Sequence, residues 1–242
     1  MSIKRIGEDH VRAVPEPEWT DTWHPVAHFK VLDALDIILK VQGIGIINKV
    51  FTLNKSGVNL FGTYILDCGE NSKYMIGFRN SLAKLFSLGF CAGNHVTVCS
   101  NMMFSGQFMD FRRHTGGLNW EELLYFTETA FQKVFEIMGK LKEWQENLKN
   151  KDMKENEFKI LTFNAIQQGA LLPSKFNEFI SSFENQGIQE KEFKNTLHQF
   201  HGGFTRMLRN ESLFNISYRT PLIKNLLDEW IENYPVLNRR AI

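Results

Sequence analysis

The chain has 242 residues, of which 43% are hydrophobic and 23% charged, and its formal net charge is +1. These values are typical of a globular protein and exclude a largely disordered or fibrous chain. Taken alone, the small net charge does not indicate a highly charged partner such as nucleic acid.

An irregular arm is expected over residues 1–22, where Pro15 and Pro17 stand among acidic residues. Residues 23–118 are predicted to form an α+β core domain. Hydrophobic periodicity and turn residues predict its elements in chain order: a helix over 26–43, a hairpin over 44–68 that turns at 54–57, a strand over 73–79, a helix over 81–90, a strand over 95–100, and strand-like residues over 102–115 that bend at Gly106. This order favours a mainly antiparallel sheet with packed helices.

Residues 119–242 are predicted to form an all-helical half that packs on the core domain. An apolar stripe from residue 119 to 150 predicts one long helix, and shorter helices are expected over 158–168 and 175–185. The segment 190–208 is expected to break at Gly202 and Gly203, because glycine disfavours the helix. A last helix is expected to begin with Thr220 as its cap and Pro221 as its first residue.

The chain is expected to be a soluble, cytoplasmic protein with no membrane partner. Neither the amino-terminal residues nor the most apolar stretch, residues 41–51, has the apolar length of a secretory signal or a membrane span. The cysteines Cys68, Cys91 and Cys99 lack close pairwise spacing. This favours reduced, buried thiols over a disulfide framework.

Basic residues are concentrated in the segment 71–118. Its only acidic residue is Asp110, so the rest of the chain is net negative, and its basic residues are Lys73, Arg79, Lys84, Arg112 and Arg113. This segment is therefore the part of the chain whose charge best suits an anionic partner.

Two interpretations apply to Arg79, Asn80 and Ser81, which lie where a strand is predicted to meet a helix. Together with Lys84, they could form an anion site, because the amides of a helix amino terminus and a guanidinium both bind anions. In the alternative, Asn80 or Ser81 only caps the helix and Arg79 pairs with an acidic neighbour.

Further candidate binding residues are Asn101, Arg112, Arg113 and His114. Asn101 follows a predicted strand and could contact a ligand or satisfy its own backbone in a turn. Adjacent strand residues point to opposite faces, so we expect only one of the two arginines to line a given groove. The alternative for this pair is a solvated strand end.

The sequence favours a protein without catalytic activity, metal or cofactor. It contains no nucleophile-elbow, phosphate-loop or zinc-protease motif. His24 and His28 are four residues apart, and His198 and His201 three apart, so each pair could face one ion on a helix. Neither pair has an evident third ligand, and Pro25 interrupts the first pair.

Short motifs occur in order through the basic segment: Gly77, Arg79, Asn80 and Ser81; Ala92 and Gly93; Cys99 and Asn101; Phe104, Ser105 and Gly106; Arg113, His114 and Thr115. In this order they resemble the phage- and plasmid-encoded family called domain of unknown function 932. The hairpin at 50–66 and the segment 212–230 are also similar to that family. It usually has His-Asp before the lysine, where this chain has Leu82 and Ala83. The resemblance implies a mobile element and a bacterial host, but no settled reaction.

Two functions compete. The first is a non-enzymatic phage or prophage accessory protein that binds nucleic acid, including single strands during recombination or replication. The predicted element order is loosely similar to that of single-strand annealing proteins. A homo-oligomer is a further candidate partner state of the chain. The 21 phenylalanines could include surface rings for base stacking or could simply fill the interior. The second function is a counter-defence protein that binds a host immune protein or its signalling ligand.

Overall fold

The computed structural model describes residues 5–18, 20–21, 23–67, 73–83, 85–96, 101–104, 109–112, 119–211 and 213–233. Its strands are β1 (Arg5–Ile6), β2 (Gly45–Leu53), β3 (Asn59–Asp67), β4 (Lys73–Ser81), β5 (Leu88–Val96), β6 (Asn101–Phe104) and β7 (Met109–Arg112). Its helices are α1 (Glu8–Arg12), α2 (His28–Val41), α3 (Trp120–Lys149), α4 (Glu155–Gln167), α5 (Phe176–Gln189), α6 (Leu197–Met207) and α7 (Leu213–Asn233). The predicted α+β class with a helical carboxy-terminal half is confirmed.

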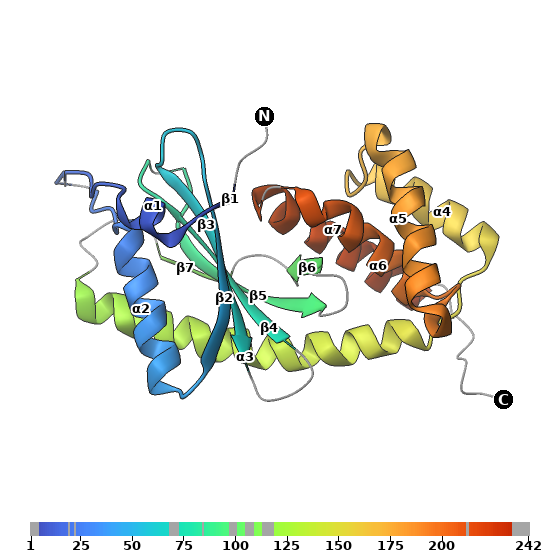
Figure 1. Ribbon diagram of the computed structural model, residues 1–242, viewed down its shortest axis with the longest axis horizontal. Helices are drawn as coiled ribbons and strands as arrows, with labels where there is room; N and C mark the ends of the chain where they lie inside the picture. Colours follow the sequence, from blue (N-terminus) through green and yellow to red (C-terminus); the bar gives the residue numbers. More distant parts are fainter. Residues whose placement is uncertain are drawn as a thin grey trace.

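The described strands form one antiparallel sheet in the order β1-β2-β3-β4-β5. Strand β5 has β4 on one side, and on the other side it pairs with both β6 and β7. Helices α2 and α3 lie against one face, and α4 to α7 lie toward the other (Figure 1).

Side chains of the central strands alternate between two hydrophobic cores, as the pleat requires. On β3, Leu60, Tyr64 and Leu66 join the core under α2 and α3, whereas Phe61 and Ile65 join the core with α4 to α7. The sheet is therefore buried on both faces.

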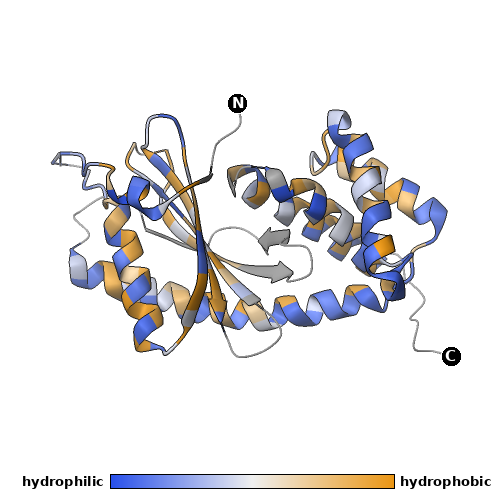
Figure 2. Cartoon of the chain, viewed as in Figure 1, coloured by the Kyte–Doolittle hydropathy of each residue, from blue (hydrophilic) through white to orange (hydrophobic). Residues whose placement is uncertain are grey.

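Helix α2 confirms the prediction from hydrophobic periodicity. The predicted core residues of this helix are all buried: Val31, Leu32, Leu35, Ile38 and Leu39. Figure 2 shows polar and apolar segments alternating along α2 and α3, as expected for helices with one face against the sheet.

The hairpin β2–β3 is also confirmed. The Gly57 amide donates to the Asn54 carbonyl over 3.0 Å, and Gly57 has a φ of 74°. Glycine adopts this left-handed conformation without a steric penalty. The turn sets the register in which Leu53 lies opposite Leu60.

The long helix α3 begins at a capping box. The Asn119 side chain accepts from the Glu122 amide over 2.8 Å, and the Glu122 carboxylate accepts from the Asn119 amide over 3.2 Å. These bonds satisfy amide groups that the first helical turn leaves open. Helix α3 runs along the molecule from α2 to the region of α4 and α5 (Figure 1).

The helix predicted over residues 81–90 is wrong. The Ser81 Oγ accepts from the amides of Ala83, over 3.2 Å, and Leu85, over 3.3 Å, and such local bonds compete with a helix. Strand β5 then begins at Leu88 and continues through the Cys-Ala-Gly-Asn stretch that we expected to interrupt regular structure. Pairing with β4 places Phe90 opposite Phe78 in the core, and this burial overrides the helical spacing.

Two predicted breaks in the helical half are also wrong. Helix α6 continues through Gly202 and Gly203, because these glycines allow α5 to approach closely: a Cβ on Gly203 would lie 2.6 Å from the Phe183 Cα. Helix α7 begins at Leu213, so that Pro221 lies inside it. Buried side chains on both sides of Pro221, including Ile216 and Ile223, hold the helix together across it.

The segment expected to be an irregular arm contributes β1 and α1 to the structure. Arg12 contacts Asp33 of α2 over 2.7 Å, and Lys49 of β2 contacts Asp36 of α2 over 2.9 Å. Arg12 and Lys49 also contact Glu8.

None of the described helices is both long and apolar enough to cross a membrane.

Candidate functional site

Arg79 lies near the end of β4, on the face of the sheet that turns toward α7. Its guanidinium is 5.2 Å from the centre of the Phe86 ring, which in turn lies 6.4 Å from the Phe214 ring of α7. Burial, opposed in part by nearby Cys91, lowers the pKa of Arg79 from its ordinary value. An arginine nevertheless stays charged at neutral pH. A phosphate would offset part of the cost of its desolvation.

Asn80 faces the other side of the sheet and is fully buried. Its Nδ2 donates to the Val26 carbonyl over 2.8 Å and to His28 Nδ1 over 2.9 Å. The His28 Nε2 donates to the Gly57 carbonyl over 3.0 Å. Asn80 therefore fixes the start of α2 to the sheet, and no helix cap or surface contact is part of this arrangement.

Ser81 is buried at the last position of β4. Its hydroxyl donates to Asn59 Oδ1 over 2.7 Å and accepts the two amides of the following turn. No helix starts here, so the helix amino terminus assumed for the predicted anion site is wrong, whereas anion binding by Arg79 stays a prediction. Among residues 79–81, only Arg79 is partly exposed.

The other candidate residues fall partly outside the described residues. Lys84, Arg113 and His114 lie outside them. Asn101 is the first residue of β6 and Arg112 the last residue of β7, and the structure defines the backbone of both.

Strand register places Arg79 and Arg112 at the same end of the sheet. Arg79 lies opposite Gly89 of β5, and Arg112 lies opposite the adjacent Leu88 on the other side of that strand. Two strand spacings, about 10 Å, separate these backbone positions. Two segments that are distant in sequence thus bring arginine positions together.

The same register places Asn101 at the opposite end of the sheet. Asn101 pairs with Val96, eight residues along β5 from Leu88, which corresponds to about 26 Å at the rise of a strand. Lys73 lies at that far end too, opposite His95. The structure therefore divides the basic segment into two separate groups.

Sequence reasoning did not single out Phe86, which lies beside Arg79, or Leu85, which precedes Phe86 in the turn after β4. Leu85 is 70% exposed, and Phe86 is half-buried against the guanidinium. Helical spacing was their only signal in the sequence, and it indicated a helix that does not form. Knowledge of the turn after β4 would have been needed to identify them.

The histidine pairs have partners other than a metal. His28 belongs to the Asn80 network, whereas His198 shares a 2.7 Å hydrogen bond with Glu190. This bond holds the pKa of Glu190 below its usual value. Among the described residues, no group of three or more His, Cys, Asp or Glu side chains is placed to hold a metal ion.

His201 of α6 is buried against α3. Its ring meets the Trp144 ring edge-on at 5.2 Å between centres. Complete burial lowers the pKa of His201 from 6.5 to about 3, with a smaller contribution from His198. The imidazole is therefore neutral in the folded protein near neutral pH.

The buried thiol of Cys91 is free, as expected, and burial raises its pKa above the ordinary value. A raised pKa disfavours the thiolate, so this cysteine does not have the properties of a nucleophile. Cys68 and Cys99 lie outside the described residues.

Comparison with known proteins gives no match to a protein-family model, a curated protein or a solved structure. The resemblance to domain of unknown function 932 therefore stays a prediction.

Proposed function

We propose that the protein binds single-stranded nucleic acid at the end of the sheet where β4 and β7 terminate, as an accessory protein of a phage or other mobile element. The observation that carries this proposal is the strand register, which places Arg79 and Arg112 about two strand spacings apart. In the sequence, Lys84 follows Arg79 by five residues and Arg113 directly follows Arg112, so the variants at these two positions belong to the same test.

The side chains around Arg79 support single strands over a duplex as the ligand. Arg79 and Phe86 combine a cation with an aromatic ring, and Leu85 adds exposed apolar surface. Unpaired bases expose faces that stack on such groups, whereas a duplex presents mainly its phosphates. The near-neutral net charge also fits a local contact with few phosphates better than an extended one.

Fluorescence anisotropy with a labelled oligothymidylate and a labelled duplex, each at low and at physiological salt, tests the proposal. Arg112→Glu and Arg79→Ala should both weaken binding of the single strand. For each phosphate that the protein no longer neutralises, the dependence of log K on log salt should become less steep by about 0.7.

Lys73→Ala is the matched control. Lys73 belongs to the same basic segment, but it lies six residues from Arg79 along β4, about 20 Å away. The Lys73→Ala variant should therefore bind the oligothymidylate almost as tightly as the unmodified protein does. If the oligothymidylate does not bind at low salt, or if Lys73→Ala weakens binding as much as Arg112→Glu, the proposal is wrong.

A second candidate function, binding of a host immune protein by a counter-defence protein, is favoured by the surface of α4. Ile160 and Phe163 lie one turn apart on this helix and are 45% and 59% exposed. Exposed apolar pairs of this kind occur in protein interfaces. An interface with an apolar centre depends little on salt, so a partner retained at high salt would favour this function over the first.

A further inference from the structure

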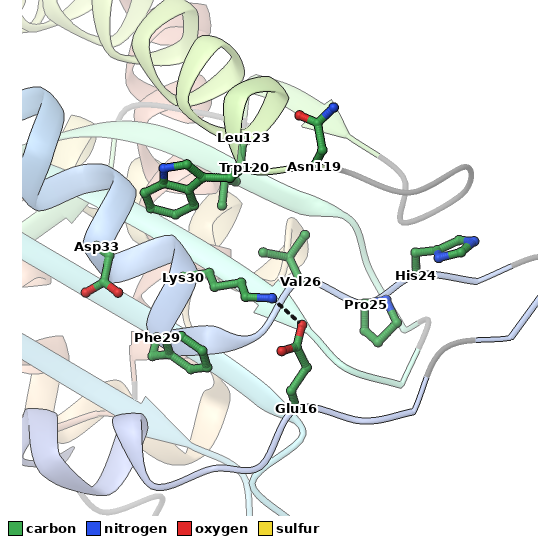
Figure 3. Close-up of a pocket in the computed structure, with 10 residues that line it drawn as sticks. All are labelled: Glu16, His24, Pro25, Val26, Phe29, Lys30, Asp33, Asn119, Trp120 and Leu123. Carbon is green, nitrogen blue, oxygen red and sulfur yellow. Dashed lines mark hydrogen bonds and ion pairs between the residues drawn. The ribbon is translucent and has the colours of Figure 1, made fainter.

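A pocket of about 380 Å³ lies between the amino-terminal ends of α2 and α3 and the segment that precedes α2. Figure 3 shows Trp120 on α3 and Phe29 on α2, with the Lys30 side chain between them. Val26 and Leu123 add apolar surface. This volume is within the range of pockets that bind small organic groups.

Trp120 is the aromatic group best placed to meet a ligand here. It is the first residue of α3, and its side chain is 41% exposed although it lines the pocket. The capping box at the start of α3 uses Asn119 and Glu122, so the helix does not need a tryptophan at this position for its own start. An exposed indole beside a pocket offers a flat surface for stacking.

The polar groups of the pocket are of both signs. Lys30 Nζ contacts Glu16 Oε1 over 2.6 Å, and Asp33 contacts Arg12 over 2.7 Å (Figure 3 shows the first pair). The walls therefore supply donors and acceptors without a net positive charge. A free phosphate would gain little here, whereas the edge of a nucleobase could bond to both kinds of group.

The pocket is fixed to the end of the sheet where nucleic acid is proposed to bind. Val26, which lines the pocket, accepts a 2.8 Å hydrogen bond from Asn80, and Asn80 directly follows Arg79 on β4. On the other side of β5, Arg112 ends β7, and Trp120 opens the next described helix only eight residues later. The Arg79 side chain and the pocket lie on opposite faces of the sheet at this end, so a strand bound at the arginine positions would reach the pocket by passing around the end of the sheet.

We infer that this pocket receives one unstacked base of a bound single strand, with the base stacked on Trp120 and its polar edge toward Lys30 and Glu16. This inference rests on the proposed function and adds a base-binding site to it. The phosphates are bound at the Arg79 and Arg112 end of the sheet, and the base enters the pocket.

Anisotropy titrations of the full chain with an oligothymidylate and with an abasic strand of the same length test the inference. Trp120→Ala should weaken binding of the oligothymidylate about tenfold, since a stacked base contributes on the order of 1–3 kcal/mol, and should leave binding of the abasic strand unchanged. Trp120→Phe should retain most of the affinity, because phenylalanine also stacks.

Tyr125→Ala is the matched control, because Tyr125 is an aromatic residue of α3 that is 73% exposed and does not line the pocket. The Tyr125→Ala variant should bind the oligothymidylate and the abasic strand with the same affinities as the unmodified protein. Thermal unfolding followed by circular dichroism verifies that each variant is folded.

The outcomes separate the inference from the proposed function. If Arg112→Glu weakens binding but Trp120→Ala does not, the protein binds nucleic acid and the base pocket is wrong. The base pocket is also wrong if Trp120→Ala weakens the abasic strand equally. If no strand binds, both proposals fail. If thymidine monophosphate binds in a Trp120-dependent way while Trp120→Ala leaves binding of the oligothymidylate unchanged, the pocket belongs to a free nucleotide and the inference about a strand is overturned.

Discussion

The two faces of the sheet are covered by helices in different ways. Under α2 and α3, aromatic rings interlock: Tyr64 meets Phe78 at 5.7 Å and Phe51 at 6.2 Å between ring centres. On the other side rings also pack closely, with Phe158 and Phe183 at 4.5 Å between centres, but there α5 and α6 also approach each other through glycine, so that a Cβ on Gly203 would meet the backbone of Phe183. Rings can move slightly to relieve a contact, but a helix backbone cannot move alone. The helical half should therefore tolerate small changes less well.

The largest effect is expected for Gly203→Ala in α6. The new methyl group would lie 2.6 Å from the Phe183 Cα, so that α5 and α6 have to separate. Overpacking of this kind typically costs about 1–3 kcal/mol, and we expect a loss of about 3 kcal/mol in the free energy of unfolding because the contact is with backbone. Urea unfolding followed by circular dichroism measures it.

Gly139→Ala in α3 is the matched control for that change. A Cβ on Gly139 would have no neighbour within 4 Å, so only helix propensity changes. This variant should be more stable by about 1 kcal/mol. A loss for Gly139→Ala, or no loss for Gly203→Ala, would contradict the comparison.

The second-largest effect is expected on lowering the pH, where protonation linked to His201 should reduce the free energy of unfolding. The pKa of His201 is about 3 in the folded protein, whereas a solvent-exposed histidine, as in the unfolded chain, has a pKa of 6.5. The unfolded chain therefore binds the extra proton as pH falls below 6.5, and stability falls with it. Between about pH 7 and pH 5 this residue should account for about 2 kcal/mol of lost unfolding free energy.

His201→Asn removes the titrating group and serves as the comparison for the effect of acid. It should be less stable than the unmodified protein near neutral pH, because asparagine has no ring to pack against Trp144. Its unfolding free energy should however fall less between about pH 7 and pH 5. Protonation of Glu190 does not account for a loss of stability between pH 7 and pH 5, because the lowered pKa of this carboxyl lies below 4.5. An equal fall in both proteins would show that His201 is not the source.

The smallest effect is expected for Gly62→Ala on the face under α2 and α3. A Cβ on Gly62 would lie 2.3 Å from the tip of the Phe78 ring and 3.0 Å from Phe51. Both neighbours are side chains, so repacking of the rings can absorb part of the clash. We expect a loss of about 1 kcal/mol in urea unfolding. If Gly62→Ala costs more than Gly203→Ala, the rings are the more rigid element and the comparison is reversed.

The candidate site was only partly predictable from the sequence. The concentration of basic residues in 71–118 was visible, but their division between two ends of the sheet depends on pairing between β4, β5, β6 and β7. Asn80 and Ser81 were selected as candidate anion-binding or helix-cap residues. Burial and the bonds to Val26 and Asn59 give them roles in fixing the fold, which residue type alone could not reveal.

Local sequence determined the elements whose signals agree with their tertiary setting. Periodicity determined α2, the left-handed Gly57 determined the hairpin turn, and Asn119 determined the start of α3. Tertiary structure alone decided where local signals and burial conflict. Pairing with β4 made Leu88 to Phe90 a strand, close packing against α5 kept α6 helical through two glycines, and core contacts carried α7 past Pro221. A glycine inside a helix costs only about 1 kcal/mol relative to alanine, whereas burying a large apolar side chain stabilises the fold by about 1.5–3 kcal/mol. Packing therefore prevails in such conflicts.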